Sequence, residues 1–145
     1  MSAGVAPGRL YLVDTSAFAR IDQLPVRDVV AALVADQAAA TCVTVDLEAC
    51  YSGRNEDDVR SIARRRRSQY RALPINEAIA QRARDVQVRM SGRGHHRAAG
   101  VVDLLTAAIA EYHGAIVLHY DAGFEHIAAT TGQPHVWVVP RGTLS

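Results

Sequence analysis

Residues 101–124 of the chain read VVDLLTAAIAEYHGAIVLHYDAGF. The first half has the strongly apolar pattern of a helix from Val101 to His113, and Gly114 provides its end, because glycine readily adopts the conformation that closes a helix. The second half, Ala115 to Tyr120, is a short run of strand-forming residues that ends at Asp121. The stretch therefore predicts a helix followed by a buried strand, with an acidic residue directly after the strand.

The same alternation continues on both sides of this stretch. Strands are predicted at Leu10–Val13, which ends at Asp14, and at His135–Val139. Strands separated by helices, without a hairpin signal, predict an α/β fold with a central, mainly parallel β-sheet flanked by α-helices. The remaining predicted elements are helices at Val26–Ala40, at Val45–Tyr51 with Thr44 as N-cap, at Glu56–Leu73, and at Ile75–Met90 with Asn76 as N-cap, and a loop at Ser91–Gly100.

The composition fits one compact domain spanning residues 1–145, with residues 1–9 as a flexible N-terminal extension. Hydrophobic residues make up 49% of the chain, so a packed core is expected. No apolar run approaches the roughly 20 residues that span a membrane, and the N-terminus lacks a signal-peptide pattern, which together predict a cytoplasmic protein without a membrane partner. Cys42 and Cys50 lie in apolar surroundings and are expected to be reduced thiols.

The charged residues exclude several enzyme classes. The chain has a net charge of +1, and all 16 of its basic residues are arginine. A haloacid-dehalogenase-type phosphatase and a phosphoacceptor receiver domain both require a lysine, and the phosphatase also requires an Asp where Ser16 stands. The glycine-rich G-K-[ST] loop of a P-loop NTPase is absent as well.

Four acidic residues stand at places where the fold would gather them. Asp14 and Asp121 each follow a predicted strand, Asp103 lies at the start of an apolar helix, and Glu48 has apolar neighbours. Taken singly, each could be a helix cap or a solvent-facing acid. Taken together, they would repel one another unless a cation compensates them, and oxygen ligands alone suit Mg²⁺ or Mn²⁺. Such a site favours phosphodiester chemistry.

The order of these motifs resembles that of a known family. The segments LYLVDTSA, VTVDLEACYSGR and HHRAAGVVDLLTAAIAEYHGAIVLHYDAGFEHIAATTG, and the closing VWVVPRGTL, are similar to those of PIN-domain ribonucleases, specifically the VapC-type toxins of bacterial toxin–antitoxin pairs. The resemblance covers essentially the whole chain and implies a PIN-like fold.

The resemblance also implies roles for individual residues. Asp14 and Asp103 would be the main metal ligands, and Glu48 and Asp121 would complete the catalytic acidic pocket, with Asp121 also reaching the metal. Ser16 would support Asp14, or would simply be a helix-start residue. Many relatives carry a second Asp two residues after the equivalent of Asp121, where this chain has Gly123. Either Glu125 substitutes for that Asp, or the site has one acid fewer.

The activity implied is that of a Mg²⁺-dependent endoribonuclease, the toxin of a type II toxin–antitoxin system, which hydrolyses RNA with a metal-activated water. The implied partners are a cognate VapB-type antitoxin, the RNA substrate and a second copy of the chain in a homodimer. Two alternatives stay open. One is a catalytically weak PIN-like module that binds RNA or protein, which Gly123 supports, and the other is a structure-specific DNA nuclease.

Basic residues outside this acidic set have two interpretations each. The run Arg64–Arg67 is either a solvated helix face or a patch that steers phosphates. His95, His96 and Arg97 lie in the loop before Asp103 and are either RNA contacts or ordinary surface residues.

Two further side chains are also considered. His119 is expected to be a hydrogen-bonded core histidine, or else a residue that lines the site. Trp137, in an apolar strand, is expected to pack in the core.

Overall fold

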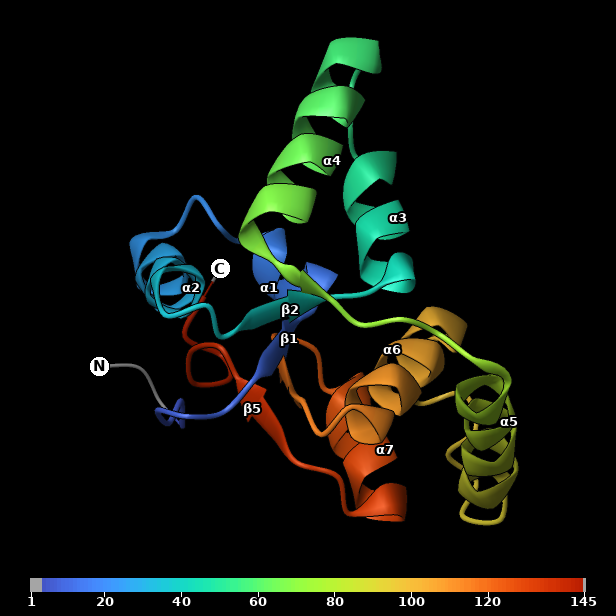
Figure 1. Ribbon diagram of the computed structural model, residues 1–145. Coiled ribbons are helices and arrows are strands. Elements are labelled where there is room, and N and C mark those ends of the chain that lie inside the picture. Colours follow the sequence, from blue (N-terminus) through green and yellow to red (C-terminus); the bar gives the residue numbers. More distant parts are fainter. Residues whose placement is uncertain (1–3, 145) are drawn as a thin grey trace.

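A computed structural model describes residues 4–144 of the chain (Figure 1). A single five-stranded sheet has the strand order β3-β2-β1-β4-β5, and every neighbouring pair is parallel. The α/β prediction with a parallel sheet is therefore confirmed. The strands are β1 (Tyr11–Val13), β2 (Ala39–Thr41), β3 (Arg71–Ala72), β4 (Ile116–His119) and β5 (His135–Trp137). The helices are α1 (Thr15–Phe18), α2 (Leu24–Ala35), α3 (Val43–Tyr51), α4 (Glu56–Gln69), α5 (Glu77–Ser91), α6 (Val101–Tyr112) and α7 (Gly123–Thr131).

Two predicted helices were too long, because each ran into a strand. The helix that begins near Val26 ends at Ala35, and Ala39–Thr41 forms β2 beside β1. Alanine is a strong helix former, so this run has no local strand signal, and pairing with β1 decides its conformation. In the same way, α4 ends at Gln69 and is followed by β3.

The starts of two helices test the predicted caps. Asn76 accepts the Ile79 N–H through its side chain at 2.9 Å, so its N-cap role is confirmed. Thr44 is not a cap, because α3 begins one residue earlier, at Val43. The Thr44 hydroxyl instead pairs with that of Thr106 at 2.7 Å, which joins α3 to α6.

Two apolar clusters fill the two faces of the sheet. In Figure 1, α5, α6 and α7 lie on one side of the strands and α2 lies on the other, while α3 and α4 extend together from the sheet. The larger cluster packs Leu12 and Val117 against residues of α6 such as Ile109, and the other packs Tyr11 and Leu118 against α2. This arrangement fixes β1 and β4 at the centre of the molecule.

The start of the described chain contacts the rest of the protein. The Ala6 N–H donates a hydrogen bond to the Tyr11 hydroxyl at 2.8 Å, and Val5 packs beside the α2 cluster. Residues 1–3 of the predicted extension lie outside the described residues. Within residues 4–144, none of the helices has the length and apolarity needed to cross a bilayer.

Candidate metal centre

The first acid of the site, Asp14, is fixed where β1 ends. The residue is 3% exposed and caps α1. Its Oδ2 accepts hydrogen bonds from the Ser16 backbone N–H at 2.9 Å and from the Ser16 hydroxyl at 2.6 Å. The Ser16 oxygen in turn accepts the Tyr120 N–H at 2.9 Å, so this one hydroxyl ties the end of β1 to the end of β4. Asp14 Oδ1 is buried and has no hydrogen-bond partner.

Asp121 follows β4, the neighbour of β1 in the sheet. Its carboxylate Oδ1 accepts the Gly123 N–H at 2.8 Å, and its own backbone N–H donates to His119 Nδ1 at 3.1 Å. Parallel strands end at the same edge, so β1 and β4 carry Asp14 and Asp121 to one place, as the sequence predicted.

Helices supply the other two acids. Asp103 lies in the first turn of α6, where its Oδ2 accepts the Gly100 N–H at 3.2 Å. Glu48 lies on α3, and its Oε1 accepts a hydrogen bond from the Thr15 hydroxyl at 2.9 Å. Thr15 is a residue that the sequence reasoning missed, although it stands directly after Asp14.

The four carboxylates interact electrostatically. Burial, which has the largest effect, and the neighbouring charges of Asp14, Asp121 and Glu48 together raise the pKa of Asp103 to about 7. Burial also raises the pKa of Asp14, against the lowering effect of the Ser16 hydrogen bonds, and Glu48 and Asp121 add to the rise. The structure therefore brings all four predicted acids into one cluster that is unfavourable when fully ionised.

The donor set of this cluster fits a hard divalent cation. The orphaned Asp14 Oδ1 is a buried acceptor that lacks a donor, and a cation would satisfy it while offsetting the repulsion. Among residues 4–144, no three His, Cys, Asp or Glu side chains already stand close enough to hold a metal ion. An ion bound here would require the four carboxylates to draw closer together, which would also compensate their repulsion.

Glu125 does not take part in the acidic cluster. Glu125 accepts the Trp137 Nε1–H at 2.9 Å and pairs with Arg141 at 3.1 Å, so both its oxygens already have partners. At Gly123, a Cβ atom would meet the Ala99 Cα at 3.3 Å. The backbone of the loop before α6 thus lies where a side chain at position 123 would begin.

That loop, residues 92–100, lies against α7. Arg93 donates to the Ala129 carbonyl oxygen at 2.9 Å, and the His95 ring meets the His126 ring edge-on, with centroids 5.2 Å apart. His96 and Arg97, in contrast, are exposed. Of the three predicted RNA contacts, His95 therefore helps to anchor the loop, and the other two remain accessible.

The arginine run is only partly a solvated face. Arg64, Arg65 and Arg67 are exposed, but Arg66 is 2% exposed. Its guanidinium stacks over the rings of Phe18 and Tyr70, at 4.9 and 4.6 Å from their centroids. Planar guanidinium groups stack well on aromatic faces, and the two rings come from distant parts of the chain, so the sequence pattern does not reveal this burial.

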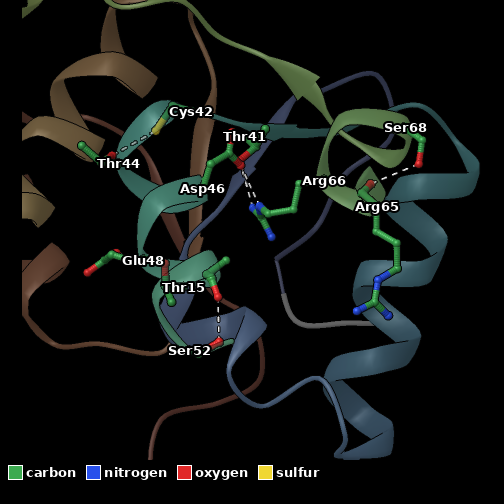
Figure 2. Close-up of polar contacts among 11 residues, drawn as sticks. Thr15, Thr41, Cys42, Thr44, Asp46, Glu48, Ser52, Arg65, Arg66 and Ser68 are labelled. Carbon is green, nitrogen blue, oxygen red and sulfur yellow. Dashed lines mark hydrogen bonds and ion pairs between the residues drawn. The ribbon is translucent and has the colours of Figure 1, made fainter. Parts of the chain in front are cut away.

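Figure 2 shows how Arg66 is neutralised. Its Nε donates to Asp46 Oδ1 at 2.7 Å and its Nη2 to the Thr41 hydroxyl at 2.9 Å. Asp46 is an acid that the sequence analysis did not single out. Glu48, one half-turn further along α3, points away from this pair in Figure 2. Helix α3 therefore uses one acid for stability and directs the other to the site.

The two aromatic positions behave differently. His119 is 0% exposed and hydrogen-bonded, so the prediction of a core histidine is confirmed. Trp137 packs against the rings of His119 and Tyr120 but stays part-exposed, so it is not a full core residue.

Known proteins resemble this chain in sequence and in fold. The family model described as "PIN domain" matches residues 11–130. Ribonuclease VapC21 of Mycobacterium tuberculosis is 38% identical, over 92% of this chain and 96% of that protein. Ribonuclease VapC51 of the same species is 41% identical, with the same two coverages.

Among solved structures, VapBC2 from Rickettsia felis bound to a promoter DNA fragment has a TM-score of 0.71 at 13% identity, covering 88% of this chain and 98% of that one. FitAcB from Neisseria gonorrhoeae has a TM-score of 0.68 at 15% identity, covering 89% and 98%.

Proposed function

The chain belongs to the PIN-domain family as a VapC-type member, and from this premise we propose that it is a Mg²⁺-dependent endoribonuclease. It would act as the toxin of a type II toxin–antitoxin pair. The observation that carries the metal dependence is the buried, unpartnered Asp14 Oδ1 within a cluster of four interacting carboxylates. An acidic pocket of this kind repels a polyanionic RNA unless a cation is bound in it.

Each residue of the pocket has a distinct proposed task. Asp14, Asp103 and Asp121 hold the ion, which when bound lowers the pKa of a water and stabilises charge on the phosphate. Ser16 keeps Asp14 oriented through its two short hydrogen bonds, which leave Oδ1 available. Glu48, held by Thr15, accepts the proton of the attacking water. Mn²⁺ is expected to substitute for Mg²⁺, because both prefer oxygen ligands.

The proposed partners are a VapB-type antitoxin and a second copy of the chain. One of the structures that resemble this fold is a toxin–antitoxin complex from Klebsiella pneumoniae. Val43, Leu47 and Tyr51 lie four residues apart along α3 and are 42%, 66% and 93% exposed, which makes an apolar stripe. A stripe of this kind on a solvated helix favours contact with another protein, and we assign it to the homodimer.

The test is cleavage of end-labelled RNA and of matched single-stranded and branched DNA, with Mg²⁺ and with EDTA. RNA alone should be cut, and only with the ion present. Asp14→Asn and Asp103→Asn should abolish cutting, whereas Asp85→Asn, an exposed acid on α5, should leave it unchanged. RNA binding without cleavage would favour the non-catalytic module instead, and preferential cutting of DNA would favour the DNA nuclease.

A further inference from the structure

His119, two residues before Asp121, has a hydrogen-bond partner at each of its two ring nitrogens. His119 is fully buried on β4, and its ring packs against the rings of Phe124 and Trp137, with centroid distances of 5.0 and 4.9 Å. Its Nδ1 lies 3.1 Å from the Asp121 backbone nitrogen, and its Nε2 lies 2.8 Å from His135 Nδ1. A buried imidazole with two such partners is held in one orientation.

The chemistry of the partners determines where the protons are. A backbone N–H can only donate, so His119 Nδ1 must accept the Asp121 N–H and carries no proton itself. The neutral ring then carries its proton on Nε2, which donates to His135 Nδ1.

The hydrogen bond to His119 Nδ1 holds the backbone of Asp121. The Asp121 amide is bonded to His119, and its carboxylate Oδ1 accepts the Gly123 N–H at 2.8 Å. Both contacts lie in the short connection between β4 and α7, where backbone torsions would otherwise set the direction of the side chain. The Asp121 backbone is thus anchored to the ring of His119, and its carboxylate is anchored to the Gly123 amide.

We propose that His119 is a positioning residue for Asp121, holding its backbone through an unprotonated Nδ1 so that the carboxylate stays in place for a divalent cation. His135 selects the required tautomer by accepting the Nε2–H. The inference rests on the proposed function only in taking Asp121 as part of a cation site. Outer contacts of this kind typically change metal affinity by about 10- to 100-fold when they are removed.

A matched pair of substitutions separates positioning from packing. In His119→Asn, the amide oxygen takes the place of Nδ1 and can accept the Asp121 N–H. In His119→Gln, the longer amide takes the place of Nε2 and can reach His135, but the acceptor for Asp121 is lost. Both variants remove the same ring from the contacts with Phe124 and Trp137. The Mg²⁺ concentration at half-maximal thermal stabilisation is measured for each, together with kcat and the Mg²⁺ dependence of cleavage.

The expected result is a Mg²⁺ midpoint within about 3-fold of wild type for His119→Asn and at least about 10-fold higher for His119→Gln. Equal shifts in both variants, no shift in either, or a larger shift for His119→Asn would overturn the proposal. His113→Asn and His113→Gln are the matched controls, because His113 follows α6 at the end opposite Asp103 and bonds the Pro74 carbonyl oxygen. Neither control should move the midpoint.

Nitrogen-15 NMR of histidine-labelled wild type tests the tautomer without any substitution. His119 should show a protonated Nε2 and an unprotonated Nδ1 at neutral pH, and a proton on Nδ1 would overturn the inference. A wild type that cleaves RNA with Mg²⁺ but fails these tests would leave the proposed function standing. A wild type that binds no Mg²⁺ would overturn both.

Discussion

Replacing Asp103 with asparagine should stabilise the metal-free protein at alkaline pH. The pKa of Asp103 is raised from 3.8 to about 7, first by burial and then by the charges of Asp14, Asp121 and Glu48. The unfolded chain therefore loses this proton at a lower pH than the native protein does. The resulting penalty on the native state is absent below about pH 4, grows as the pH rises, and is complete above about pH 7.

The size of this penalty follows from the shift in pKa. Each unit corresponds to about 1.4 kcal/mol, so a shift of about three units gives a ceiling of about 4 kcal/mol. Asp103 is only half-buried, and solvent screens its repulsion, which reduces the expected gain for Asp103→Asn to about 1–2 kcal/mol. For a domain of 145 residues, that gain raises Tm by about 2–8 °C.

Thermal melts in EDTA at about pH 4 and about pH 8 measure this effect, with circular dichroism as the signal. The Tm of the variant should equal that of wild type at the acid pH and should be higher than that of wild type at the alkaline pH. Saturating Mg²⁺ should stabilise wild type and reduce or reverse the difference, because the ion compensates the charge that the variant lacks. Asp85→Asn, on exposed α5 surface, should stay within about 0.5 kcal/mol of wild type throughout. An Asp103→Asn protein less stable than wild type at alkaline pH without metal would refute the reasoning.

Three further substitutions test other contacts. Ser16→Ala should lower kcat, and it should lower the free energy of unfolding by about 1–3 kcal/mol, because the buried Asp14 carboxylate loses a donor at 2.6 Å. Urea melts and cleavage rates measure the two effects, and an unchanged cleavage rate would contradict the prediction. Arg66→Leu should lower the free energy of unfolding in urea by about 1–3 kcal/mol, because the buried Thr41 hydroxyl and the part-exposed Asp46 lose their donor. Exposed Arg65→Ala should change it by at most about 0.5 kcal/mol. Glu125→Gln should leave the Mg²⁺ midpoint of cleavage unchanged, because its carboxylate is committed elsewhere, and a higher midpoint would show that it serves the metal after all.

The sequence was sufficient for the elements with strong periodicity and for the acids that follow them. Asp14 and Asp121 could be predicted to meet because both end apolar strands, and parallel strands end at one edge. Strand β2 could not be predicted, since Ala39 and Ala40 favour a helix locally and become a strand only through pairing with β1.

The contacts that support the site were much harder to foresee. Arg66 stands in a run of four arginines, and only its stacking on Phe18 and Tyr70 distinguishes it from its neighbours. His119 and His135 are separated by 16 residues, and their contact depends on the pairing of β4 with β5. Such links join distant segments, so no local pattern encodes them.

The pairing of β1 with β4 has a consequence for how the protein is made. Tyr11 lies opposite Ile116, so the central strand pair joins two segments that are 105 residues apart in the sequence. Asp14 can therefore meet Asp103 and Asp121 only after most of the chain has left the ribosome. A nascent or truncated chain that stops before β4 has no assembled acidic pocket. Translation itself thus delays assembly of the acidic pocket until the residues through Asp121 have been made.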